Sequence, residues 1–222
     1  MLWLGVVAHY LGAEILTRTG FEGTRIIRFV RIIQQANIWI FRRFDSPSPT
    51  FVKHSRLRKY HVDCATWIES GTFHGLTTKM LSNLGDFVYS VEPGTTLFRN
   101  AEKYFSRYKN VEILNGTSEE IFPNLLKEIN GNVCFWLDGH YSGGDTFLGA
   151  NETPIIAELV AIQENLEHFG QVAVLIDDVR CFNPSNSQYA TYPTLDYLVH
   201  WAHNCGFSWT IEHDIFIAFN RR

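Results

Sequence analysis

Short apolar runs alternate with longer helix-like stretches from about residue 62 to the end of the chain. Five of these runs, rich in branched and aromatic residues, have the length and composition of buried strands. They occupy residues 66–69, 87–92, 111–114, 133–137 and 172–176. The alternation predicts parallel strands joined by right-handed crossovers, with helices on both faces of the sheet. Two last runs, at 207–211 and 215–219, predict a hairpin that completes a doubly wound, mostly parallel, seven-stranded α/β sheet.

The N-terminal part of the chain has a different pattern. Between residues 21 and 44, apolar residues recur at helical spacing and are interleaved with arginines, which predicts a basic amphipathic helix. The prolines at 47 and 49 then interrupt any helix, because proline lacks a backbone donor and disfavours a helical residue before it. We therefore expect a basic helical N-terminal arm over residues 1–61 and the α/β domain over residues 62–222.

Length and charge limit the partners of these two parts. A chain of 222 residues that is 45% hydrophobic can bury one sizeable core with an extension. The net charge of −4 divides unequally: residues 1–61 hold ten Lys/Arg and three Asp/Glu, a charge of +7, which leaves −11 on the rest. An acidic domain repels a phosphate backbone, so we expect no nucleic-acid partner. The basic helix either lies on an anionic membrane surface or packs against a second subunit or its own core.

The sequence also indicates a compartment. No run approaches the roughly 20 apolar residues that span a bilayer, and the apolar start lacks a basic leader and a cleavage site. Four cysteines are far apart in the sequence and form no CxxC pair. They are Cys64, Cys134, Cys181 and Cys205. These features favour a soluble protein of the reducing cytoplasm.

The first candidate site follows the run at 66–69. The sequence Glu69-Ser-Gly71-Thr72-Phe73-His-Gly75 is a glycine-rich strand-to-helix turn, which lets a ligand approach the backbone closely. Its GxxxG spacing differs from the GxGxxG pyrophosphate fingerprint, and Glu69 would repel a diphosphate. A cationic, phosphate-free nucleotide suits this turn better, although a purely structural turn is the alternative.

Two more strand ends add polar groups. Glu92 ends the next run, 23 residues after Glu69, where a carboxylate can accept both hydroxyl hydrogens of a ribose. A solvent-exposed glutamate at a strand end is the alternative. The third run ends in Asn115-Gly-Thr117-Ser118, whose short side chains either contact an adenine edge or cap the next helix.

Three aspartates follow the fourth and fifth runs. Asp138 comes after the fourth run, and Asp177 and Asp178 come after the fifth, so all three open into the same crevice of a doubly wound sheet. Converging carboxylates repel one another unless a positive charge lies between them, and hard oxygen ligands suit Mg²⁺. We therefore predict a divalent metal at these three residues. The alternative is a site without a metal, in which one acid caps a helix or forms a salt bridge and another is solvated. Adjacent strand residues point to opposite faces, so Asp177 and Asp178 can act together only beyond the strand end.

These motifs occur in the order typical of the class I S-adenosylmethionine (SAM)-dependent methyltransferases, which the chain resembles over about residues 62–222. The matching segments are Glu-Ser-Gly-Thr-Phe-His-Gly at 69–75, Val-Glu-Pro at 91–93, Asn-Gly-Thr-Ser at 115–118 and Leu-Asp-Gly-His at 137–140. The resemblance implies a Rossmann-like fold with SAM as cofactor. It implies cofactor contacts from Glu69, Gly71, Thr72, Phe73, Gly75, Glu92, Pro93, Thr117, Ser118 and Asp138. Many members place an acid at the adenine position, where this chain has Thr117 and Ser118.

The aspartate pattern also looks like the metal-dependent sugar O-methyltransferases of the macrocin type and their relatives near polysaccharide pathways. That likeness implies methylation of a hydroxyl on a sugar, a glycan or a glycosylated metabolite. A hydroxyl must lose its proton to attack the sulfonium methyl, and His140 is our candidate general base, with Asp138 beside it. Tyr141 and Asp145 are weaker candidates for acceptor contacts.

Three other functions are kept open. A catechol-like aromatic acceptor shares the metal chemistry. A nicotinamide-dependent oxidoreductase is disfavoured by the missing third glycine and by Glu69. A non-catalytic SAM-fold module would act through its basic arm, and any of these proteins could form a homo-oligomer.

Overall fold

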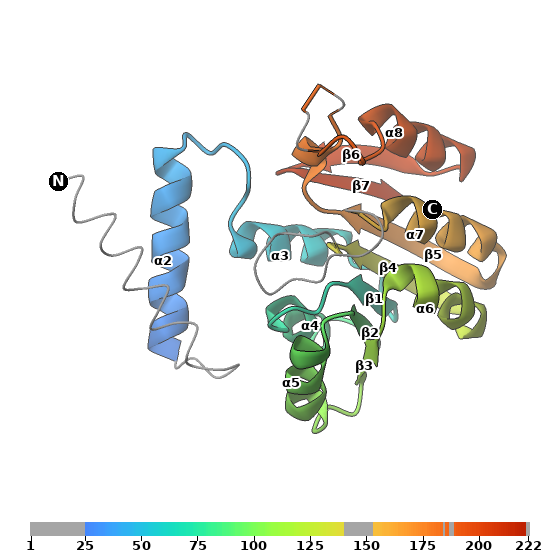
Figure 1. The fold of residues 1–222 in the computed structure, drawn as a ribbon, viewed down its shortest axis with the longest axis horizontal. Helices are drawn as coiled ribbons and strands as arrows, with labels where there is room; N and C mark the ends of the chain where they lie inside the picture. Colours follow the sequence, from blue (N-terminus) through green and yellow to red (C-terminus); the bar gives the residue numbers. More distant parts are fainter. Residues whose placement is uncertain (1–24, 140–152, 184, 187–188, 221–222) are drawn as a thin grey trace. The chain divides into compact units, whose positions relative to one another are not determined.

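The computed structural model describes residues 25–139, 153–183, 185–186 and 189–220 (Figure 1). The chain divides into two compact units, Met1–Phe44 and Asp45–Arg222. In the first unit, helix α2 (Arg25–Phe41) forms where the sequence predicts a basic amphipathic helix. Its apolar side chains include several that are exposed to solvent, at Val30, Ile33, Ile40 and Phe41. Among the described helices, none is both long and apolar enough to cross a membrane.

The second unit is built on one seven-stranded sheet in the order β3-β2-β1-β4-β5-β7-β6. In Figure 1 the strands follow one another from β6 at the top to β3 at the bottom. Their bounds are β1 Thr66–Ser70, β2 Phe87–Glu92, β3 Val111–Asn115, β4 Gly131–Leu137, β5 Phe169–Ile176, β6 Ser208–Glu212 and β7 Ile215–Phe219. Strands β1 to β5 are parallel, and β7 runs antiparallel to β5 and β6. This confirms the predicted doubly wound sheet with its closing hairpin.

Helices cover both faces of this sheet. They are α3 (Thr50–Tyr60), α4 (Leu76–Leu81), α5 (Thr95–Phe105), α6 (Ser118–Leu125), α7 (Ile155–Glu164) and α8 (Leu195–Asn204), with short 3₁₀ turns at Leu126–Glu128, Leu166–His168 and Val179–Cys181. Side chains of β1 alternate between two cores, since Ile68 packs with residues of α6, α7 and α8 and Trp67 with residues of α3 and α4. Chain order reverses between β1 and β4, so the crevice at their carboxyl ends is the expected place for a ligand.

Helix α3 packs on the sheet as part of the second unit. Leu57 and Tyr60 lie in the core beside Trp67. The Glu212 carboxylate at the end of β6 accepts hydrogen bonds from Arg56 and from the Tyr60 hydroxyl, both at 2.6 Å. The sequence analysis assigns residues 45–61 to the N-terminal arm, whereas the second compact unit begins at Asp45. The prolines at 47 and 49 do fall close to the division between the units.

Candidate active site

The turn after β1 packs between the carboxyl ends of β2 and β4. The backbone N–H groups of Gly71 and Thr72 donate to the carbonyl of Val91 at 3.0 and 3.2 Å. Gly71 has φ +91°, and a Cβ placed on it would lie 2.7 Å from the carbonyl oxygen of Asp138. Only glycine combines this backbone conformation with this close approach. Gly71 therefore brings the carboxyl ends of β1, β2 and β4 together at the switch point of the sheet.

The same turn holds a second constrained residue. Phe73 has φ +47° and an exposed ring, and Gly75 at φ +66° precedes the first residue of α4. A left-handed conformation costs a non-glycine residue about 1–2 kcal/mol. The backbone N–H of Phe73 donates to Glu92 Oε2 at 2.7 Å, which offsets part of this cost. Such backbone strain concentrates at ligand sites, and here it is held by the glutamate predicted to bind ribose.

Glu92 is buried, and both of its carboxylate oxygens accept backbone hydrogen bonds. Oε2 accepts from Phe73, and Oε1 accepts from the N–H of Gly94 at 2.9 Å. Burial raises the pKa of Glu92, although these two hydrogen bonds work in the opposite direction. Because each carboxylate oxygen has two lone pairs, each can still accept a hydroxyl hydrogen. Glu92 is thus not a solvent-exposed glutamate: it holds the turn in place and keeps the capacity to bind a diol.

Glu69 is fully buried beneath the turn. Its Oε2 accepts hydrogen bonds from the hydroxyls of Thr78 at 2.5 Å and Ser90 at 2.6 Å. Its Oε1 has no hydrogen-bond partner among the described residues. Burial raises the pKa of Glu69 to about 8 against the effect of these hydroxyls, and the nearby charges of Asp138 and Glu92 raise it further. Three acids therefore lie close together around Gly71, an environment that favours a cationic ligand over an anionic one.

The end of β3 shows the capping alternative of the sequence analysis. Thr117 is the N-cap of α6, and its backbone N–H donates to Glu120 Oε2 at 3.3 Å. Ser118 is buried, while the side chain of Asn115 donates to the backbone carbonyl of Glu92 at 2.9 Å. Pro93, which follows Glu92, is half-buried. The capping geometry fixes these groups near the crevice, and their contact with an adenine stays a prediction.

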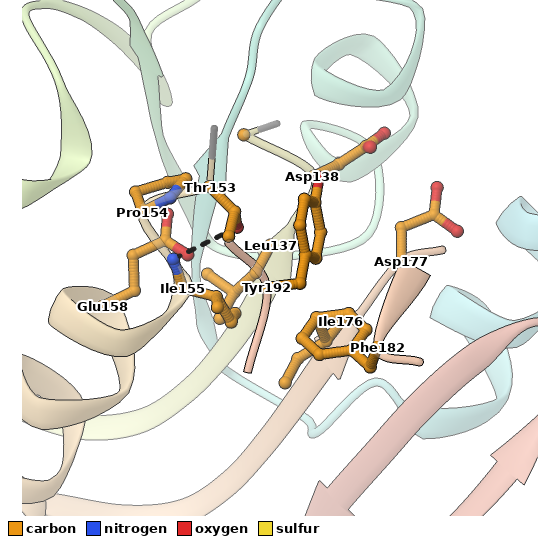
Figure 2. A pocket seen from close by; sticks show the side chains of 11 residues that line it. Leu137, Asp138, Thr153, Pro154, Ile155, Glu158, Ile176, Asp177, Phe182 and Tyr192 are labelled. Carbon is orange, nitrogen blue, oxygen red and sulfur yellow. Dashed lines mark hydrogen bonds between the residues drawn. The ribbon is translucent and has the colours of Figure 1, made fainter. Parts of the chain in front are cut away.

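The aspartates at the ends of β4 and β5 converge as the sequence analysis requires. β5 ends at Ile176, and Asp178 is left-handed at φ +59°, so the chain has left the strand before both acids. Figure 2 shows the carboxylates of Asp138 and Asp177 projecting from neighbouring strand ends. The backbone N–H of Asp178 donates to Asp177 Oδ1 at 2.9 Å.

A lysine that the sequence analysis did not single out lies among these acids. Lys53 of α3 forms an ion pair with Asp177 Oδ2, and its Nζ is 3.5 Å from Asp178 Oδ1. Burial lowers the pKa of Lys53, but the three aspartates outweigh it and raise the value overall. The sequence did predict that the converging acids need a positive charge between them. A lysine can supply that charge in place of a metal. Among the described residues, no group of three His, Cys, Asp or Glu side chains is arranged to hold a metal ion.

A small pocket opens beside the aspartates (Figure 2). Asp138 and Asp177 line it together with Glu158 and Thr153 from the start of the α7 region, and the rings of Phe182 and Tyr192 also face it. Glu158 is buried, and its Oε1 has no hydrogen-bond partner in the described part of the chain. Burial raises the pKa of Glu158 to about 7, despite the nearby hydroxyls of two serines. Carboxylates on two walls of a pocket are acceptors suited to the hydroxyl groups of a ligand.

Some predicted residues fall in a part of the chain that is not described. His140, the candidate general base, lies outside the described residues, as do Tyr141 and Asp145. Their roles stay predictions.

Comparison with known proteins finds distant structural matches. No family model matches the sequence, and no curated protein matches it. Solved structures of similar fold include SMU.1697c of Streptococcus mutans, assigned as a methyltransferase and solved in complex with SAH. It is 16% identical with a TM-score of 0.49, over 79% of this chain and 98% of that one. An rRNA methylase of Streptococcus thermophilus is 15% identical with a TM-score of 0.44, over 79% and 96% of the two chains. Precorrin-6y C5,15-methyltransferase of Geobacter metallireducens is 15% identical with a TM-score of 0.45, over 76% and 86%. At such identities these likenesses do not reveal a substrate.

Proposed function

We propose that this chain is a SAM-dependent O-methyltransferase that methylates a hydroxyl group of a sugar, a glycan or a glycosylated metabolite. One observation carries the proposal: the acids Glu69, Glu92 and Asp138 gather around Gly71 at the switch point of a doubly wound sheet. Such a site disfavours the diphosphate of a nicotinamide dinucleotide. It favours a nucleoside that carries positive charge, as the sulfonium and ammonium groups of SAM do.

The cofactor contacts follow from this placement. Glu92 would accept the ribose hydroxyls, and the turn that contains Gly71, Thr72, Phe73 and Gly75 would receive the methionine moiety. Glu69, which is buried beneath this turn, would balance the positive charge of the methionine moiety. The remaining proposed contacts lie at the ends of β2, β3 and β4, at Pro93, Thr117, Ser118 and Asp138.

The acceptor would occupy the pocket beside Asp138. Carboxylates from Asp138, Asp177 and Glu158 supply hydrogen-bond acceptors on its walls, which supports a polyhydroxyl acceptor. The rings of Phe182 and Tyr192 in the same pocket favour the second candidate, a small aromatic acceptor of the catechol type.

In the proposed reaction, the acceptor hydroxyl loses its proton to a general base as its oxygen attacks the methyl carbon. The carbon–sulfur bond breaks, its electron pair stays on sulfur, and S-adenosylhomocysteine (SAH) leaves. His140 is the proposed base, since an imidazole titrates near neutral pH. The predicted metal does not fit the aspartates as they are arranged, because Lys53 is bonded to Asp177 and Arg180 donates to Asp178 Oδ1 at 2.6 Å. No step of this mechanism passes through a metal.

Calorimetric titration of the purified full chain tests the cofactor proposal. SAM and SAH are expected to bind at micromolar concentration, and NADH is expected not to bind. A screen of glycans and catechols with methyl-labelled SAM then identifies the acceptor class. Folded protein that binds neither SAM nor SAH would refute the proposal and favour a non-catalytic scaffold.

The partners and the compartment stay proposals as well. We expect a cytoplasmic protein. We also expect no nucleic-acid partner, because residues 62–222 carry a charge of −11. The exposed apolar residues of α2 are compatible with either of its two interpretations, a membrane surface or packing against protein.

A further inference from the structure

We propose that the ammonium group of Lys53 is the resident cation of the carboxylate cluster formed by Asp138, Asp177 and Asp178, in the place where a divalent metal was predicted. Helix α3 then completes the acceptor side of the active site. The description of this cluster as the acceptor side rests on the proposed function, whereas the arrangement of charges does not.

The cluster has the geometry of a buried ion pair. Lys53 Nζ is bonded to Asp177 Oδ2 and lies 3.5 Å from Asp178 Oδ1. The side chain of Lys53 is 19% exposed, and those of Asp177 and Asp178 are 0% and 7% exposed. Carboxylates removed from water in this way need a compensating positive charge, and an ammonium with three donors supplies it.

Carboxylate oxygens of two of the three aspartates, Asp177 and Asp178, are already engaged. Asp178 Oδ1 accepts from Arg180 at 2.6 Å, and Arg180 also pairs with Asp214. Mg²⁺ demands near-octahedral oxygen ligands at about 2.0–2.1 Å. A divalent ion bound here would stand next to the ammonium of Lys53, whose charge repels it. The lysine and a metal are therefore alternatives for the same position.

Helix α3 is held firmly enough to place Lys53. Glu212 accepts hydrogen bonds from Arg56 and Tyr60, and Leu57 is fully buried against the sheet. On the neighbouring residue, burial and nearby positive charges lower the pKa of His54 to about 4, so that its ring stays neutral and adds no second cation. This anchoring distinguishes Lys53 from a surface lysine that happens to meet an acid.

Lys53 is a positioning residue in this scheme. By neutralising Asp177, Lys53 would hold that carboxylate in place where Asp177 lines the pocket. Loss of the charge is therefore expected to raise the KM for the acceptor more than it lowers kcat.

The test uses Lys53→Met, which removes the charge at similar length, and Lys53→Arg, which keeps it. Lys59→Met is the matched control on the same helix, since the Lys59 side chain is 50% exposed and pairs with Glu212. We expect MgCl₂ and EDTA to leave the thermal unfolding of the wild-type chain and of Lys59→Met unchanged. Lys53→Met should unfold about 5–10 °C lower, and MgCl₂ should restore part of that loss, because Mg²⁺ compensates the carboxylate charge that the variant leaves unpaired. Lys53→Arg should remain close to wild type.

Two results would overturn the proposal. One is calorimetric binding of Mg²⁺ to the wild-type chain that disappears in Asp177→Asn, a measurement that does not depend on how well the Lys53 variants fold. The other is a Lys53→Met variant whose stability MgCl₂ does not change, which would reduce Lys53 to a structural ion pair. SAH titration of the wild-type chain judges the proposed function separately, since it does not depend on the Lys53 variants.

Discussion

Substitution of Glu92 by glutamine tests the centre of the cofactor site. In the structure, the two carboxylate oxygens accept from the backbone N–H groups of Phe73 at 2.7 Å and Gly94 at 2.9 Å. Glutamine keeps one acceptor oxygen and turns an NH₂ group toward the other donor. One charge-assisted hydrogen bond is lost, and the second becomes a weaker neutral one.

The magnitude follows from these contacts. Loss of a hydrogen bond to a buried charged group lowers the free energy of unfolding by about 1.5–3 kcal/mol. For a chain of this size, the melting temperature should fall by roughly 3–12 °C. The same change removes a charged acceptor for one ribose hydroxyl, so SAH should bind about 10- to 100-fold more weakly.

Differential scanning calorimetry and SAH titration of Glu92→Gln measure both effects. Glu112→Gln is the matched control, because Glu112 is an exposed residue on the neighbouring strand β3. It should keep the wild-type melting temperature and SAH affinity. A Glu92→Gln protein that is destabilised but binds SAH normally would refute the ribose role, and one with wild-type stability would refute the role of Glu92 in the turn.

Three further outcomes are expected. Gly71→Ala should abolish SAH binding, because its Cβ would lie 2.7 Å from the Asp138 carbonyl oxygen. Gly131→Ala, also at positive φ but with no atom within 4 Å of its Cβ, should bind SAH normally and lose only about 1–2 kcal/mol of stability in a denaturant titration. SAM binding at neutral pH should release protons, since burial raises the pKa of Glu69 to about 8 and a cationic ligand lowers it. Calorimetry in buffers of different ionisation enthalpy would detect this release, and equal heats in all buffers would contradict it. Burial tends to raise the pKa of Glu212, but hydrogen bonds from α3 outweigh it and lower the value to about 2. The stabilisation by Glu212 is therefore present above about pH 4.5 and lost as pH falls toward 2. Urea titrations across this range should show a steeper loss of stability for wild type than for Glu212→Gln.

The sequence by itself determined the order of the strands along the chain and, to within one residue, the carboxyl ends of the five parallel strands. The runs at 87–92 and 215–219 coincide with β2 and β7, because a strand buried on both faces must be apolar over a short, bounded length. The glycine turn and Glu92 were recognisable for a related reason. Local backbone conformation and strand termination are properties of a few consecutive residues.

Only the tertiary structure decided which groups meet across the chain. Lys53 bonds to Asp177 over a separation of 124 residues. In the sequence, a lysine that pairs with a distant acid cannot be told from a solvated lysine, because both stand on a basic helix. Helix α3 joins the α/β unit through long-range contacts of the same kind. Its hydrogen bonds to Glu212 exist only once β6 has joined the sheet. The engagement of both Glu92 oxygens by the turn also depends on β1 and β2 lying side by side. Contacts between residues far apart in the sequence form only when the strands assemble into the sheet. The periodicity of apolar residues along the chain carries no information about these contacts.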